Sequence, residues 1–377
     1  MRVTILIHLF FLVAIPGPGC SMLLPENQEN DQNLSNPVGS ESGANAPDLA
    51  ATRASESEKS VAPEHRKKIQ LFILAGQSNM SGRGKGYSED KFSTDSAVYV
   101  FGNDYRWKIA RPPIDSSRDQ LDQVSMDTGT GMDPSLPFAY ELRKHNPDMI
   151  IGLVPCAMGA TTMFEWERRS GRDSLYGSCL YRAKLASKMG TIKAVLFFQG
   201  EWDAVDVEFS RLLAENHRPP EKKPENLIQY SLDPESLPAG MTIQDLKQRK
   251  LTSTNAGQIP IQNAGEHWTI QLQGSRGYNR GEPALWGLLF ADFVNNFRGD
   301  LQTPELPVIF AQIGDQKRPD VYKHWKTVQE AQSSINLENV SMIRTSGLPL
   351  RDSVHFTAES YLIIGQRFAH AYLHQYR

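Results

Sequence analysis

Short apolar runs alternate with segments of helical spacing along most of this chain, and this alternation restricts the possible folds. Apolar runs of about four to eight residues, bounded by glycine or polar residues, are typical of strands buried on both faces. Such runs lie at 69–75, 97–101, 149–154, 192–198, 306–313 and 340–343, and helical spacing is found at 135–145, 180–189, 285–297, 321–336 and 358–374. Strands separated by helices predict an α/β fold with a mostly parallel sheet, covered by helices on both faces.

The composition along the chain predicts three regions. Residues 1–20 carry Arg2 and then an apolar run that Pro16 ends, which is typical of a secretory signal peptide and short for a membrane span. Residues 21–66 are polar with almost no aromatic side chain, so they cannot bury enough apolar surface to offset the entropy of ordering. We expect a disordered linker there and one folded domain over 67–377.

An insertion at about 205–283 interrupts the alternation inside the expected domain. It is thin in apolar residues apart from 268–272, which alternate like a strand. Loops of this length in a compact domain are uncommon and are often lids or binding loops, so we favour a role at a substrate cleft. The alternative is a solvated excursion without a role.

Cys20 leaves two routes of export open. Between Gly19 and Ser21 it resembles the cysteine of a bacterial lipoprotein signal, which becomes the lipidated N-terminus and would anchor the protein to a membrane. A plain cleaved signal would instead release the protein. Either route predicts an exported protein, whether secreted, periplasmic or held in the cell envelope. In such an oxidising compartment Cys156 and Cys179 can pair; because Cys156 follows an apolar run, we favour a buried free thiol.

The overall charge argues against a nucleic-acid partner. The formal net charge is -3, and no basic block runs along the chain. The cysteines and histidines show no spacing that is typical of a metal site. We expect neither a metal nor an organic cofactor, since the serine chemistry described below requires none.

Four clusters of chemistry-bearing residues follow four of the expected strands. They are Gly76-Gln-Ser-Asn79, Pro155-Cys-Ala-Met-Gly-Ala-Thr-Thr162, Gln199-Gly-Glu-Trp-Asp203 and Asp352-Ser-Val-His355. In a parallel sheet these turns share the carboxyl edge, where ligands bind in open α/β folds. Each cluster also has an ordinary interpretation as a turn or a helix cap, but four of them at strand ends favour a common site.

The clusters together contain the parts of a serine hydrolase. Ser78 is the candidate nucleophile, His355 its base, and Asp352 the acid that orients the imidazole. The backbone N–H groups of Ser78 and Gly159 and the side-chain amide of Gln199 are candidate oxyanion donors. The pattern Gly-x-Ser-x-Met argues against the nucleophile elbow of α/β-hydrolases, which has Gly-x-Ser-x-Gly.

These motifs resemble those of carbohydrate acetylesterases. The closest matches to carbohydrate esterase family 6 and the sialate O-acetylesterase domain, within the SGNH hydrolases, are residues 76–84, 151–159, 199–201 and 352–355. The resemblance implies a three-layer α/β/α sandwich, with Ser78, His355 and Asp352 as the catalytic residues. It also places Gly159 and Gln199 at the oxyanion positions.

Two departures from the family concern the neighbourhood of these residues. Ala160 stands where the family usually has glycine, and Trp202 where it usually has serine or threonine. An aromatic side chain there could stack on a sugar or pack inward. We assign to substrate binding the residues that flank the catalytic positions, namely Gln77, Asn79, Glu201 and Trp202.

The favoured function is a serine esterase that removes O-acetyl groups from an acetylated oligo- or polysaccharide through an acetyl-enzyme. The substrate could be of the acetylxylan or the sialate type. One alternative is a general carboxylesterase on the same fold. Another is an envelope protein that binds carbohydrate with an inactive site.

Overall fold

The computed structural model describes residues 49–86, 94–127, 129–205, 226–232, 261–264, 267–274 and 283–376. The expected signal peptide, Cys20, the first part of the expected linker and most of the insertion lie outside these residues. Within them, no helix is both long enough and apolar enough to cross a bilayer.

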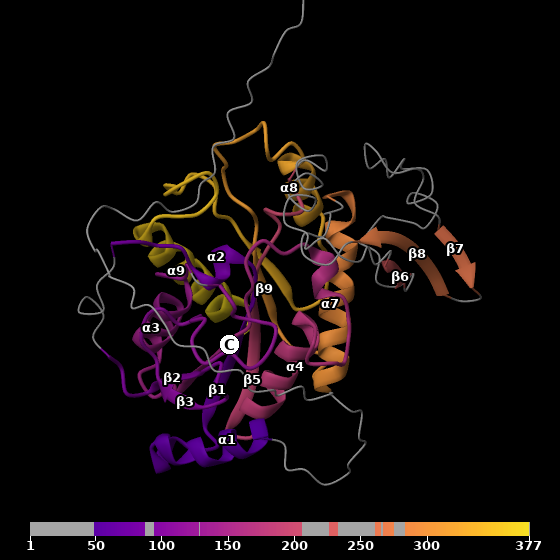
Figure 1. The fold of residues 1–377 in the computed structure, drawn as a ribbon. Helices are drawn as coiled ribbons and strands as arrows, with labels where there is room; N and C mark the ends of the chain where they lie inside the picture. Colours follow the sequence, from indigo (N-terminus) through magenta and orange to yellow (C-terminus); the bar gives the residue numbers. More distant parts are fainter. Residues whose placement is uncertain are drawn as a thin grey trace, which may run out of the picture. The chain divides into compact units, whose positions relative to one another are not determined.

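A seven-stranded sheet forms the centre of the fold (Figure 1). Its order is β10 (Val340–Ile343), β9 (Val308–Ala311), β5 (Gly190–Phe198), β1 (Ile69–Gly76), β4 (Ile151–Pro155), β2 (Val98–Phe101) and β3 (Trp107–Ile109). Every neighbouring pair is parallel except β2 and β3. This confirms the mostly parallel sheet. Because β1 lies between β4 and β5, the turns after these three strands are neighbours at the carboxyl edge.

Helices cover both faces of the sheet, as the alternation predicts. The helices on one face are α1 (Leu49–Ser57), α4 (Leu175–Ala186), α7 (Trp286–Leu301) and α8 (Trp325–Ser333), and those on the other are α3 (Ser135–His145) and α9 (Ala358–Gln375). Figure 1 shows α3 and α9 on the opposite side of β1 and β5 from α4 and α7.

The central strand explains why the apolar runs are continuous. Leu71 and Ile73 of β1 belong to the core on one face, whereas Phe72 and Leu74 belong to the core on the other. A strand that is buried on both faces needs apolar side chains at consecutive positions. The result is the three-layer α/β/α sandwich expected from the sequence.

Several boundaries differ from the predictions, among them those of one helix and of the linker. The helix expected over 321–336 is shorter and begins at Trp325. The disordered linker was expected to reach residue 66, but α1 begins at Leu49, and that part of the prediction is wrong. Ala50 and Ala54, each 4% exposed, pack into the core one helical turn apart. Two alanines contribute little to the apolar content averaged over this segment, and the residues around them are polar. The composition therefore did not indicate a buried helical face.

Three strands of the insertion form a separate antiparallel sheet. In this sheet β8 (His267–Gly274) lies between β6 (Asn226–Leu232) and β7 (Ile261–Ala264). The strand predicted from the alternation at 268–272 is thereby confirmed. The proposed role of the insertion at the substrate cleft rests on residues outside the described ones.

Cys156 and Cys179 form a disulfide. Cys156 directly follows β4, and Cys179 lies on the buried face of α4, with 5.3 Å between their Cα atoms. That separation is within the usual range for a disulfide. The prediction of a free thiol is therefore wrong. The apolar run before Cys156 places this cysteine in the core, and there it lies beside the buried Cys179.

Candidate active site

The serine predicted to be the nucleophile lies directly beyond the end of β1. Gly76 ends the strand with a φ of 130°, and a Cβ atom there would lie 2.1 Å from the Phe198 carbonyl oxygen of β5. Only glycine avoids this clash and adopts this conformation readily. The Gln77 N–H then donates to the same carbonyl over 2.8 Å. Ser78 begins the short helix α2 (Ser78–Ser81) and is 6% exposed.

His355 connects the hydroxyl of Ser78 to the carboxylate of Asp352. Nε2 of His355 lies 2.8 Å from Oγ of Ser78, and Nδ1 lies 2.9 Å from both carboxylate oxygens of Asp352. Asp352 also accepts the backbone N–H groups of His355 at 2.9 Å and Val354 at 3.1 Å. The carboxylate therefore holds both the loop after β10 and the ring that the loop carries. The structure brings together the three side chains that the sequence assigned to catalysis.

The charge state of Asp352 suits an orienting carboxylate. Burial raises the pKa of this carboxyl, but the hydrogen bond and charge of the His355 ring, with two backbone N–H groups, outweigh burial and hold the pKa well below its usual range. Asp352 is ionised at neutral pH as a result. When it accepts from Nδ1–H, the Nε2 atom of His355 is left to accept the proton of Ser78.

Three of the predicted substrate-binding residues instead form a buried network. Gln77, Asn79 and Glu201 are each at most 2% exposed. The carboxylate of Glu201 accepts the side-chain amides of Gln77 and Asn79, while Asn79 Oδ1 accepts the Tyr361 hydroxyl at 2.7 Å. Side chains so enclosed offer no open face to a sugar. Their contacts join α2, the turn after β5 and α9, so we assign them to positioning Ser78 in place of binding substrate.

Trp202 lies in the same turn but differs from these three residues. It is half-buried, whereas Glu201 beside it is almost fully enclosed.

A second aromatic residue, Tyr322, packs edge-on against Trp325. Burial raises the pKa of Tyr322, a hydrogen bond to Ser353 lowers it, and the charges of Glu201 and Asp352 raise it further. Tyr322 therefore lies near the loop that carries Asp352 and His355, although no sequence pattern singled it out.

The predicted oxyanion donor Gln199 has its side chain fully engaged elsewhere. It is 0% exposed. Its amide N–H groups donate to the Thr161 carbonyl at 2.7 Å and to the Asp203 carboxylate, and its Oε1 accepts the Trp286 indole N–H at 2.7 Å. In this arrangement Gln199 cannot donate to an oxyanion. The sequence placed Gln199 correctly at the strand end, in one cluster with Asp203. Its partners Thr161 and Trp286 come from distant segments and were not predictable.

The backbone N–H of Gly159 is directed at an acidic residue that the sequence analysis missed. It donates to Oδ2 of Asp127 over 2.8 Å, and the Ser81 hydroxyl donates to the same oxygen at 2.8 Å. Arg83 forms an ion pair with this oxygen at 2.7 Å. These three donors thus already bind an anionic oxygen. Asp127 lies in an irregular segment without periodicity, so no sequence signal pointed to it.

Known proteins resemble this chain over most of its length. The family model for carbohydrate esterases described as sialic acid-specific acetylesterases matches residues 68–219 and 270–374. A probable carbohydrate esterase of Arabidopsis thaliana is 28% identical over 323 residues, covering 81% of this chain and 90% of that protein. A crystal structure of that plant protein has a TM-score of 0.56 at 25% identity, covering 82% of this chain and 100% of that chain. The structure of NanS shares the fold, with a TM-score of 0.50 at 15% identity over 82% of this chain and 98% of that chain.

Proposed function

Because the chain belongs to the carbohydrate esterase family of sialic acid-specific acetylesterases, we propose that it removes O-acetyl groups from a carbohydrate by a serine mechanism. The observation that carries the mechanism is the 2.8 Å contact between Ser78 Oγ and His355 Nε2, with Asp352 on the other ring nitrogen. A hydroxyl is a weak nucleophile, and a neighbouring imidazole that takes its proton activates it.

The first half of the reaction transfers the acetyl group to the enzyme. His355 Nε2 takes the proton of Ser78 as its Oγ attacks the acetyl carbonyl carbon, and the carbonyl electron pair moves onto oxygen. The tetrahedral intermediate then collapses, the bond to the sugar oxygen breaks, and that oxygen takes the proton from His355. In the second half, water loses a proton to His355 and attacks the acetyl-enzyme. Acetate leaves, and Ser78 regains its proton.

The backbone N–H groups of Ser78 and Gly159 are the donors proposed for the oxyanion. Gly159 currently donates to Asp127, so an oxyanion at this position would replace a carboxylate oxygen. The Ser81 hydroxyl and the Arg83 guanidinium supply Asp127 with other donors once Gly159 is released. The ester therefore competes with Asp127 for one N–H group.

Sugar recognition is proposed to rest on residues around the serine, not on the buried network. Trp202 is half-buried and directly follows Glu201, which bonds to the residues flanking Ser78. An aromatic ring in such a place can pack against the apolar face of a sugar. This supports an acetylated oligo- or polysaccharide as substrate.

Export is a further part of the proposal. The Cys156–Cys179 disulfide supports it, since disulfides persist mainly in oxidising compartments. Mass spectrometry of protein from its natural source would separate a lipid adduct on Cys20 from a plain cleaved terminus. Retention of Met1 would contradict both routes.

Acetate release from a panel of acetylated saccharides tests the proposed function. Acetylated xylan, O-acetylated sialic acid and other acetylated sugars would be compared, with the Ser78→Ala variant as the control for background hydrolysis. Faster hydrolysis of longer aryl esters than of the acetate would favour a general carboxylesterase. Saccharide binding without any acetate release would favour an inactive carbohydrate-binding protein.

A further inference from the structure

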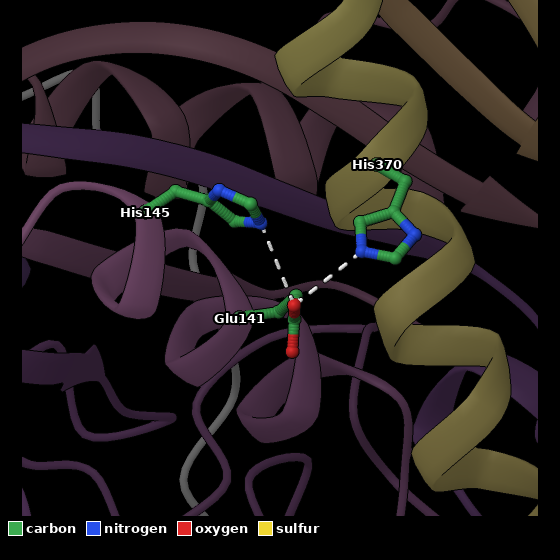
Figure 2. Close-up of side chains that lie close together, drawn as sticks. All are labelled: Glu141, His145 and His370. Carbon is green, nitrogen blue, oxygen red and sulfur yellow. Dashed lines mark hydrogen bonds and ion pairs between the residues drawn. The ribbon is translucent and has the colours of Figure 1, made fainter.

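Two neighbouring helices place metal-ligating side chains on one patch of surface, and Figure 2 shows two imidazole rings directed at one carboxylate. Glu141 and His145 lie one turn apart at the end of α3, and His370 comes from α9. Glu141 Oε1 is 3.6 Å from His145 Nε2 and 3.4 Å from His370 Nε2. The three donor atoms all lie within 4.8 Å of one another.

These separations match the ligand shell of a zinc ion. Zinc bonds to histidine nitrogen and carboxylate oxygen are about 2.0–2.2 Å long, so two ligands on a tetrahedral ion are about 3.4 Å apart. The two contacts of Glu141 already have this length. Only the two imidazoles need to approach each other. The side chains of His145 and His370 are 46% and 61% exposed, so small side-chain rotations can bring their two Nε2 atoms to the separation of tetrahedral ligands.

The packing of α3 against α9 fixes the two helices that carry the three ligands. Gly365, a little over one turn before His370, lies so close to α3 that a Cβ atom would be 2.4 Å from the Pro134 carbonyl oxygen and 2.6 Å from Pro137. Only glycine permits this approach. The two helices therefore cannot separate or slide without losing this contact, and the backbone positions of the three ligands are set before any ion binds.

Lys144 also orients the carboxylate of Glu141. Lys144 Nζ lies 2.8 Å from Oε2 of Glu141, the oxygen that does not face the histidines. One oxygen of Glu141 is therefore oriented by Lys144, and the other is directed at the two imidazoles. Partners of this kind, which fix the ligands themselves, are a regular part of metal sites.

We propose that Glu141, His145 and His370 bind a zinc ion, with water in the fourth position. Two imidazoles and a carboxylate suit a borderline ion such as Zn²⁺ better than Mg²⁺ or Ca²⁺, which take oxygen ligands. Sequence spacing did not predict this site because its third ligand comes from a helix distant along the chain.

The ion would join the two helices far from the esterase site. α9 begins at Ala358, close behind His355, and at about 1.5 Å per residue His370 lies about 18 Å further along the helix. The ion therefore takes no part in ester hydrolysis. Its effect would be to stabilise the folded state, because an ion that binds only the folded chain raises its stability.

Zinc titration of the metal-free protein by calorimetry tests this proposal. We expect the wild type to bind one more equivalent of Zn²⁺ than each of the variants Glu141→Gln, His145→Ala and His370→Ala, or to bind that equivalent at least tenfold more tightly. Zinc should raise the Tm of the wild type, and this rise should be lost in the same variants. Cobalt(II) should give the absorption of a tetrahedral site in the wild type alone.

His374→Ala is the matched control, because His374 lies on α9 one turn beyond His370 and is exposed. Zinc binding by this variant should equal that of the wild type. If it loses the equivalent while His145→Ala keeps it, the ion is held along α9 alone and the proposed site is wrong. Equal zinc binding by the wild type and all three ligand variants would also overturn it. Acetate release should be unchanged in every variant, which separates this proposal from the proposed esterase function.

Discussion

The Gly159 backbone N–H donates to the carboxylate of Asp127, 2.8 Å away. Hydrogen bonds to an ionised acceptor are stronger than those to a neutral one. The donor predicted to stabilise the oxyanion therefore binds a carboxylate when no ester is present. The geometry that would bind a negatively charged oxygen is in place, but an internal competitor occupies it.

Removing this competitor should favour the reaction. In Asp127→Ala the Gly159 N–H no longer has to leave a carboxylate before it donates to the oxyanion. A hydrogen bond to a charged acceptor is stronger than one to a neutral acceptor by about 1 kcal/mol, which corresponds to roughly a fivefold rise in kcat/KM. The rate of hydrolysis of a small aryl acetate measures this change in kcat/KM. Asp173→Ala, an exposed aspartate outside these contacts, is the control. A loss of more than about tenfold would mean that Asp127 positions Ser81 and Arg83 for catalysis.

Ser78→Ala should abolish esterase activity without unfolding the protein. Loss of a nucleophile can cost on the order of a million-fold in kcat. The only hydrogen bond of the hydroxyl described here is the one to His355, so the Tm should change little. An active-site phosphonate should label the wild type on the peptide that contains Ser78 and leave the variant unlabelled. Turnover by the variant at a tenth of the wild-type rate would disprove the assignment.

Asp352→Asn should impair the enzyme through the tautomer of His355. An amide that donates to Nδ1 leaves the proton on Nε2, which then cannot accept from Ser78, and comparable changes cost about 10⁴ in kcat. Acetate release over a range of pH is the measurement. Asp320→Asn serves as control because Asp320 pairs with Arg318 on the exposed surface. An unchanged rate and pH profile would show that another group orients the imidazole.

The sequence predicted the elements better than their arrangement. β1 was recognisable because a strand buried on both faces needs a continuous apolar run, whereas β3 is short and only Trp107 in it is buried. The order of strands depends on crossovers between distant segments, which no local pattern records. The same limit applies to the cysteine pair, because the distance between Cys156 and Cys179 is set by how α4 packs on β4.

The site was predictable where its chemistry lay at strand ends. Ser78, Asp352 and His355 carry reactive groups at positions that a parallel sheet brings to one edge. Burial was not predictable in the same way. Glu201 has the composition of a surface turn residue, yet the amides of Gln77 and Asn79 enclose it in the folded protein.

Glu201→Gln tests whether this network positions Ser78 or binds substrate. A glutamine would place its one NH2 group opposite the side-chain amide of either Gln77 or Asn79, leaving a buried donor without an acceptor at a cost of about 1–3 kcal/mol. We expect the Tm to fall and kcat for a small aryl acetate to fall with it, while KM for acetylated saccharides changes little. Glu330→Gln, on the exposed face of α8, is the control. A rise in saccharide KM with an unchanged Tm would restore the role in substrate binding.

Two buried carboxyl groups predict how stability depends on pH. Burial raises the pKa of Asp115 to about 7 despite a hydrogen bond from Ser125, and burial likewise raises the pKa of Asp203 to about 7 despite hydrogen bonds from Gln199 and Met163. An aspartate in the unfolded chain has a pKa of about 3.9. Between these values the folded state holds more protons than the unfolded state.

From this difference in proton binding, the free energy of unfolding should fall as pH rises from about 4 to about 7. The contribution of each group is fully present below the unfolded pKa and is lost as pH rises through the folded pKa. Urea unfolding at pH 5 and pH 7.5 measures the change. Asp115→Asn and Asp203→Asn remove one titrating group each, so each variant should lose less stability between the two pH values than the wild type. Variants with the same pH dependence as the wild type would show that neither carboxyl is protonated in the folded protein at pH 5.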